Sequence, residues 1–196
     1  MTSSLAAAPS VGTKVLGLLG ILGGSILLLA FVPVVPWDGD FFNLRLVLFN
    51  IGAIAIVIGV YRRQSVGAPR LALAAAIPAV VANAVYVAMV LRLVALPGEP
   101  GRGDYGTWFA IAATALWLAD AWFGLVLFRI GGASRAGGAA LAIGSILAWG
   151  GLDRLGLVSG DLAGIFGLLS LAGIALSGCA WIALGLDLAR RPVRPA

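Results

Sequence analysis

Residues Leu71–Leu96 read LALAAAIPAVVANAVYVAMVLRLVAL, an apolar stretch with a single charged side chain, Arg92. A helix needs about 20 apolar residues to cross the hydrocarbon core of a bilayer, because each residue adds about 1.5 Å of length. The stretch exceeds that length and is longer than the apolar face of an ordinary core helix. It therefore predicts a transmembrane helix.

Five further stretches of similar character lie on either side of it. They are Val15–Val35, Leu44–Tyr61, Thr107–Phe128, Ala136–Val158 and Leu162–Leu186. The breaks between the stretches are turn-forming or charged segments, such as WDGD, RRQSVGAPR and PGEPGRGDYG. The composition agrees, since 61% of residues are hydrophobic, 11% are charged and the mean hydropathy is +1.07. Soluble domains are about half apolar and a quarter charged.

The predicted fold class is all-α, a polytopic membrane protein with six transmembrane helices. Short loops favour antiparallel neighbours, so we expect three antiparallel hairpins with both termini on one side. Six spans within 196 residues leave no room for a separate soluble domain. We expect a cytoplasmic N-terminal segment over 1–14, a single membrane domain over 15–188 and a basic cytoplasmic tail over 189–196.

The basic residues indicate the orientation, because cytoplasmic loops are enriched in Lys and Arg. Four of the thirteen fall on one side: Arg45, Arg92, Arg102 and Arg154. The other nine, predicted to be cytoplasmic, are Lys14, Arg62, Arg63, Arg70, Arg129, Arg135, Arg190, Arg191 and Arg194. This count predicts cytoplasmic termini. The preference for Arg over Lys and the wealth of Gly and Ala are typical of a GC-rich bacterial genome and favour a bacterial plasma membrane.

The partners expected from the charge are lipids. Arginine clusters beside a membrane contact anionic headgroups, which accounts for a pI of about 10.4 without any nucleic-acid partner. The chain has no histidine and one cysteine, Cys179, so histidine-based catalysis, internal disulfides and thiolate metal clusters are excluded. We expect no cofactor and no metal. No nucleophile and base pair supports an enzyme.

The most polar residues inside the predicted spans share one depth. Asn50, Asn83 and Asp120 each lie within about three residues of the middle of their spans, or roughly 4 Å along a helix. Tyr86 follows Asn83 by three residues and Trp117 precedes Asp120 by three, so both belong to the same candidate cluster. An ionised acid in lipid costs several kcal/mol, so Asp120 should face the interior, uncharged and hydrogen-bonded to Asn50 or Asn83.

A second candidate cluster is predicted at the outer surface. Its members are Arg45, Arg92, Trp149, Asp153 and Arg154. They lie near the outer ends of three different spans, where charged side chains pair or extend to the interface and tryptophans form a belt.

Small residues recur at helical spacing, for example Gly17, Gly20 and Gly24 in the first span. Such residues let helices approach closely. They either pack the bundle or leave one stripe, in the first span, for a partner membrane protein or a second copy. The function expected from the sequence is a non-catalytic membrane protein acting through helix packing or partner contacts, such as an accessory, regulatory or assembly subunit. The alternative is a small-solute or proton-linked transporter, or its solute-binding subunit, using the Asp and Asn cluster.

Overall fold

The computed structural model describes residues 11–29, 39–64, 67–95, 102–131, 134–149 and 161–190, and in these residues every regular element is a helix. In chain order the helices are α1 (Val11–Leu29), α2 (Gly39–Gln64), α3 (Pro69–Ala95), α4 (Arg102–Ile130), α5 (Arg135–Ala148) and α7 (Asp161–Arg190). Five of them, all but α5, are long and apolar enough to cross a membrane. The all-helical membrane-protein class is therefore supported.

The fifth predicted span is wrong in its length. A single helix was expected over 136–158, whereas α5 ends at Ala148 after 14 residues, with the Trp149 amide donating to the Ser145 carbonyl 3.0 Å away. At about 1.5 Å per residue this helix is about 21 Å long, short of the roughly 30 Å hydrocarbon core. Two glycines, Gly150 and Gly151, follow in the sequence, and glycine is the usual residue just beyond a helix end.

The boundaries of the first predicted span are also displaced. A helix was expected over 15–35, whereas α1 begins at Val11 and ends at Leu29. Pro33 and Pro36 follow in the sequence, and helices usually end before a proline because the residue preceding it disfavours the helical conformation. Residues 30–38 lie outside the described part of the chain.

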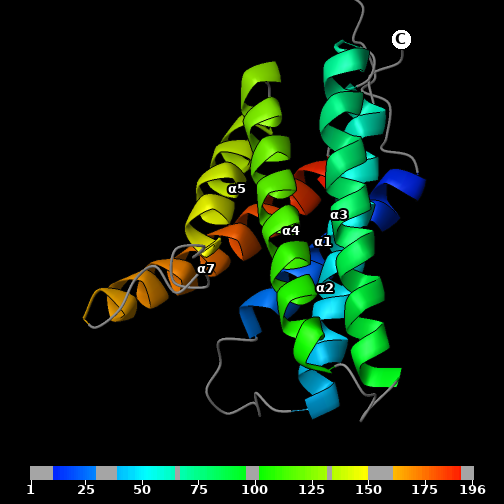
Figure 1. Cartoon of the computed structure of the whole chain (residues 1–196). Helices are drawn as coiled ribbons and strands as arrows, with labels where there is room; N and C mark the ends of the chain where they lie inside the picture. Colours follow the sequence, from blue (N-terminus) through cyan, green and yellow to red (C-terminus); the bar gives the residue numbers. More distant parts are fainter. Residues whose placement is uncertain are drawn as a thin grey trace, which may run out of the picture.

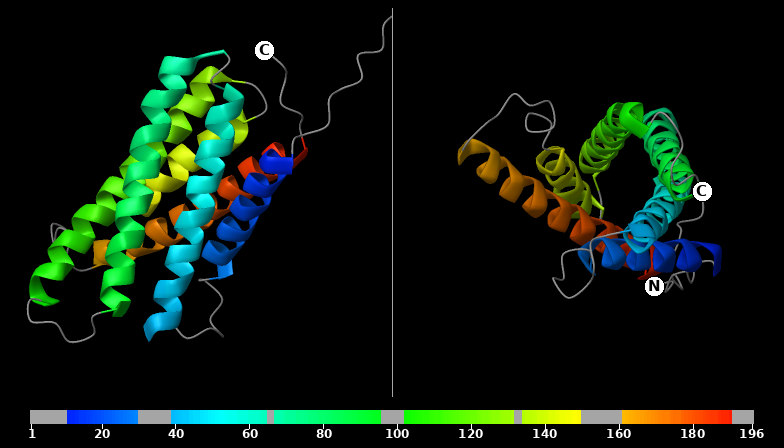
Figure 2. Two further views of the ribbon diagram at one scale, coloured as in Figure 1. Left: turned by 90° about the vertical axis from the view of Figure 1, so that its right-hand side faces the viewer. Right: turned by 60° about the horizontal axis from the view of Figure 1, so that its bottom comes forward.

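The six described helices form a ring (Figures 1 and 2). Each packs against the next in chain order, from α1 to α5 and then α7, and α7 returns to pack against α1. Figure 2 shows α1 and α7 side by side along one wall, with α2 to α5 forming the rest of the ring. The first part of α7 extends beyond the bundle and exposes Ile165, Leu168, Leu169 and Leu171.

Glycines lie at the contact points of four of the six interfaces. The facing pairs are Gly23 with Gly52 (α1 and α2), Gly17 with Gly185 (α1 and α7), Gly124 with Gly138 (α4 and α5), and Gly144 with Gly173 (α5 and α7). A Cβ added at Gly124 would lie 2.6 Å from the Gly138 carbonyl oxygen, so only glycine fits there. The backbones are close enough for dispersion and weak Cα–H···O contacts to hold the helices together.

The glycines of the first span follow the first of the two alternatives, packing of the bundle. Gly17 and Gly24 are buried against α7, and Gly20 is buried against Ile56 of α2. The small-residue stripe of the first span is therefore occupied by helix contacts inside the bundle. α3 has no glycine, and its buried face carries alanines instead: Ala72, Ala75, Ala76 and Ala79.

Two separate apolar clusters fill the interior. The large cluster draws on α1 to α5 and α7: Leu27, Phe49, Ala53, Ile56, Val57, Val60, Ala75, Ala76, Ala79, Phe123, Val126, Leu127, Leu141, Ala180, Trp181, Leu184 and Leu188. The small cluster joins α2, α3 and α4 alone: Val47, Tyr86, Val90, Ala112, Ala113 and Leu116. The outer surface of the ring is covered by exposed leucines, isoleucines and valines, as expected for helices facing lipid.

We predict that Gly173→Ala destabilises the fold. Its Cβ would lie 2.2 Å from the Ala148 amide nitrogen, so α5 and α7 must separate, at a cost of about 1–3 kcal/mol. Gly167→Ala is the matched control, because it is on the same helix and a Cβ there has nothing within 4 Å. Thermal unfolding in detergent, followed by near-ultraviolet circular dichroism, should show a lower Tm for Gly173→Ala alone. Equal Tm values for the two variants would contradict the close packing.

Candidate functional site

A fully buried carboxylate, Asp120 of α4, is the centre of the site. The side-chain nitrogen Nδ2 of Asn83 on α3 donates to Asp120 Oδ1 at 3.0 Å and to the Ala79 carbonyl at 2.8 Å. Both side chains have 0% relative exposure. The structure thus joins Asp120 to Asn83, one of the two amides expected from the sequence.

Asn50 of α2 is equally buried but bonds within its own helix. Its Nδ2 donates to the Leu46 carbonyl at 2.6 Å, and its Oδ1 has no partner among the described residues. The amide oxygen of Asn50 is therefore buried without a partner. Of the two amides predicted to bond Asp120, Asn50 is the one that does not.

These three polar residues lie where the two apolar clusters meet. On each of the three helices, the polar residue lies between the two clusters. A residue of the small cluster lies about one turn away in one direction along the helix, and a residue of the large cluster lies about one turn away in the other direction. The flanking pairs, small cluster first, are Val47 and Ala53 around Asn50, Tyr86 and Ala79 around Asn83, and Leu116 and Phe123 around Asp120. Asn50, Asn83 and Asp120 consequently share one level in the bundle.

Two serines extend this level to α5 and α7. A Cβ at Gly124 would lie 2.6 Å from both the Gly138 carbonyl oxygen and the Ala142 amide nitrogen, so Gly124 is level with the turn of α5 between these two residues. One turn back along α4, Asp120 is therefore level with the next turn of the antiparallel α5, which holds Ser145. Ser177 lies against Gly144, whose added Cβ would be 2.7 Å from the Ser177 hydroxyl oxygen. Both serines have 0% relative exposure.

We call Asn50, Asn83, Asp120, Ser145 and Ser177 the polar layer. Each has a buried polar atom with no partner among the described residues: Oδ1 of Asn50 and of Asn83, Oδ2 of Asp120, and Oγ of Ser145 and of Ser177. The two serines were not among the candidate site residues, because a serine in an apolar stretch usually bonds its own helix or a neighbouring one. Each serine lies near the middle of its apolar stretch, and this position could have indicated that it shares the membrane depth of Asn50, Asn83 and Asp120.

The two aromatic candidates border the polar layer. Tyr86 is 7% exposed, belongs to the small cluster and packs against Phe109 with ring centroids 5.1 Å apart. Trp117 is 8% exposed and lies one turn before Asp120 on α4. Both therefore lie on the side of the layer toward the start of α4.

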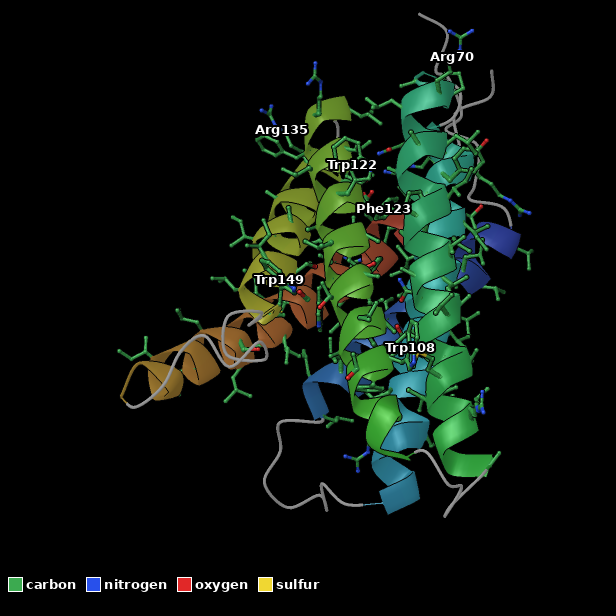
Figure 3. The ribbon with its side chains drawn as sticks, viewed as in Figure 1. Arg70, Trp108, Trp122, Phe123, Arg135 and Trp149 are labelled. Carbon is green, nitrogen blue, oxygen red and sulfur yellow. The ribbon has the colours of Figure 1, made fainter. Side chains whose placement is uncertain are left out.

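The opposite side of the layer is closed by stacked aromatic rings. Phe123, one turn after Asp120, stacks against Trp181 of α7 with ring centroids 6.2 Å apart and an interplanar angle of 17°. Figure 3 shows Phe123 projecting from α4 toward the middle of the bundle. α5 lies between α4 and α7 in the ring, so this contact crosses the interior.

A polar network that the sequence did not predict lies at the same end. The guanidinium of Arg63 on α2 forms an ion pair with Oδ2 of Asp187 on α7 and donates to the Asp187 carbonyl at 3.2 Å. Ser134, just before α5, accepts from Arg63 at 3.4 Å and donates to Asp187 Oδ2 at 3.1 Å. Gly131, with φ +83°, directly follows Ile130, the last residue of α4. Six of the eight acids are on the predicted outer side. Asp187 is an exception, because it lies on the side where most basic residues fall, and this position could have indicated an ion pair.

The end of the bundle that holds this network is called the arginine end. Arg70 at the start of α3 and Arg135 at the start of α5 lie there, whereas Trp108 and Trp149 lie toward the opposite end (Figure 3). Arg135 lies over the ring of Phe128, 4.6 Å from its centroid.

The predicted outer-face cluster is described only in part. Arg45 is half-buried on α2 and Arg92 is exposed on α3, and each has an interaction partner. Trp149 follows α5, which packs against α4 and α7, so the structure does not bring it onto the helices that carry the two arginines. Asp153 and Arg154 lie outside the described residues.

The chemistry available to the layer is that of a single carboxylate and neutral oxygens. Among the described residues no group of three His, Cys, Asp or Glu side chains could hold a metal ion. Cys179 is exposed on the surface of α7. A protein-family scan, a search of curated proteins and a search of solved structures each return no match for this chain.

We predict that Asn83 and Asp120 are energetically coupled. Asn83→Leu leaves a buried carboxyl without its donor, which should lower the free energy of unfolding by about 1–3 kcal/mol. Replacing both residues by Leu removes the two polar groups together and should recover part of that loss. A double-mutant cycle from unfolding in detergent measures the coupling. Losses that add within about 0.5 kcal/mol would contradict it.

Proposed function

We propose that this protein is a small-solute or proton-linked membrane transporter, or the solute-binding subunit of one, with the polar layer as its site. The observation that carries the proposal is that five fully buried polar side chains, from five of the six described helices, share one level and each has an unpartnered atom. Ordinary packing of apolar helices does not need such a layer.

The cost of burying these groups supports an occupant. A buried donor or acceptor without a partner costs about 1–3 kcal/mol, and native proteins satisfy such groups with protein, water or ions. Several unpartnered oxygens at one level therefore favour water or a polar solute in the layer. A transporter needs polar groups at membrane depth to bind its solute, and the polar layer supplies such groups.

The two sides of the layer differ in how they are closed. Toward the arginine end lie the large cluster, the stacked Phe123 and Trp181, and the network of Arg63, Ser134 and Asp187. Toward the other end, the described residues that cover the layer are the small cluster of α2, α3 and α4 together with Trp117. We therefore propose that the structure represents a state closed at the arginine end.

The proposed setting is the plasma membrane of a bacterium, with three antiparallel hairpins and both termini in the cytoplasm. The contacts of Gly17 with Gly185 and of Gly24 with Gly178 support it, because they require α1 and α7 to run in opposite directions. The start of α1 and the end of α7 then share one side. The excess of arginine favours the cytoplasm for that side, where anionic headgroups bind it.

Cysteine labelling tests this orientation. In a Cys179→Ser background, Gln64→Cys is at the arginine end and Thr107→Cys at the opposite end. A membrane-impermeant maleimide added to intact cells should label Thr107→Cys and not Gln64→Cys. Disrupted cells provide the control, in which both should react. Labelling of Gln64→Cys alone in intact cells would show the reverse orientation.

A flux assay tests the transport proposal. Purified protein in vesicles containing a pH-sensitive dye should carry protons inward when a potassium gradient and valinomycin make the interior negative. Asp120→Asn retains an oxygen that accepts from Asn83 but cannot exchange a proton, so the flux should be lost while the fold is kept. Cys179→Ser, a one-atom change at an exposed position, should leave the flux intact. Unchanged flux in folded Asp120→Asn would reject this role for the layer.

A second candidate is an accessory or assembly subunit that acts through partner contacts. The observation in its favour is the first part of α7, which extends beyond the bundle with exposed apolar side chains at 165, 168, 169 and 171. This candidate needs no exchangeable group at Asp120. It gains support if the Asp120→Asn variant behaves like the unaltered protein in vesicles.

A further inference from the structure

We propose that the polar layer binds a small monovalent cation, of which Na⁺ is the simplest, between the side-chain oxygens of Asp120, Asn83 and Asn50. The inference deepens the proposed function and rests on it for its biological purpose. Its structural basis is the direction of the hydrogen bonds in the layer.

The hydrogen bonds determine which atoms of the two amides remain free. Asn50 Nδ2 donates to the Leu46 carbonyl, and Asn83 Nδ2 donates to the Ala79 carbonyl and to Asp120 Oδ1. A backbone carbonyl accepts only from an N–H or O–H group, so neither amide can be turned around without losing its bond. The free atom of each amide is therefore its oxygen.

The unpartnered side-chain atoms on α2, α3 and α4 are thus all acceptors. They are Asn50 Oδ1, Asn83 Oδ1 and Asp120 Oδ2, each on a side chain with 0% relative exposure. Hard cations are bound in proteins by carboxylate and amide oxygens. An anion would meet the Asp120 carboxylate and two amide oxygens, with only the second N–H of Asn50 Nδ2 to donate to it, so the site disfavours it. A cation placed between them would satisfy these oxygens together, because each has a lone pair without a partner.

The polar layer contains one carboxyl group, and this favours a cation with a single positive charge. Within one turn of the five layer residues, the described helices contain no Lys, Arg or Glu, and Asp120 is the only acid. The titratable groups in that range besides Asp120 are Tyr86, on α3, and Cys179, which is exposed on α7. One monovalent cation neutralises one carboxylate. A divalent cation would leave a net positive charge among apolar residues, which is costly.

A proton competes with the cation for the same atom. Protonation of Asp120 Oδ2 supplies one donor and removes the negative charge, but it satisfies at most one of the two amide oxygens. A metal cation can contact all three oxygens and displaces the proton when it binds. The affinity for Na⁺ should therefore fall as the pH is lowered, which provides an exchange of Na⁺ for H⁺ at a single site.

The test is a cation-dependent thermal shift of the full chain in detergent, with choline chloride keeping the ionic strength constant. A ligand that binds only the folded state raises the Tm in a saturable manner. Na⁺ should do so, Mg²⁺ should do so much less, and acid pH should weaken the effect. Asn50→Ala and Asn83→Ala should each weaken Na⁺ binding at least about tenfold. Asp120→Asn should abolish the shift.

Ser170→Ala is the matched control. Ser170 is half-buried on α7 and donates to the Ala148 carbonyl at 2.9 Å, which places it at a helix interface outside the layer. Its Na⁺ shift should equal that of the unaltered protein. A shift that persists in folded Asp120→Asn, or that choline reproduces, would overturn the cation site.

The two proposals can fail separately. Proton flux that depends on Asp120, together with no Na⁺ shift, would overturn the cation site and leave a proton-linked transporter. A saturable Na⁺ shift that requires Asp120, together with no flux of any ion in vesicles, would leave a structural cation and overturn the proposed function.

Discussion

The close approach of helix backbones is the constraint on which this structure depends. Four interfaces of the ring place glycine against glycine, and an added Cβ at Gly124 or Gly173 would collide with the backbone of the facing helix. Helices packed this closely gain dispersion energy that lipid cannot supply. α3 has no glycine, and polar contacts to α4 supplement its alanine packing: the bond from Asn83 to Asp120, and the bond from Trp122 Nε1 to the Ala74 carbonyl at 3.2 Å.

The tight ring explains why its few buried polar side chains lie at one level. Small residues occupy the contacts between helices, so the larger side chains fill the interior and divide it into two apolar clusters. The polar layer lies between these clusters, with apolar packing above and below it. This packing separates the polar layer from both ends of the described bundle, and the network of Arg63, Ser134 and Asp187 lies beyond the large cluster at the arginine end. The proposed exchange of a proton or cation needs buried polar groups of this kind.

Much of this arrangement could be predicted from hydropathy and spacing. The stretch Leu71–Leu96 and its neighbours indicated helices long enough for a membrane, and the depths of Asn83 and Asp120 suggested their hydrogen bond. The length of α5 was missed, because apolar residues continue past Ala148 while Gly150 and Gly151 follow directly. Ser145 and Ser177 were not among the predicted site residues, since a hydroxyl in an apolar stretch gives no indication of the residues on other helices that share its depth.

The amino-acid sequence by itself determined the helical class, the positions of five membrane-length helices and the depth of each polar residue. These are local properties, because a helix rises by a constant distance per residue and an apolar stretch is visible without its partners. The order of helices around the ring, the pairing of glycines, the ion pair of Arg63 with Asp187 and the choice of Asn83 over Asn50 as donor to Asp120 were decided only by the tertiary structure. Each depends on which faces of two helices meet, and that is set by packing of the whole ring at once.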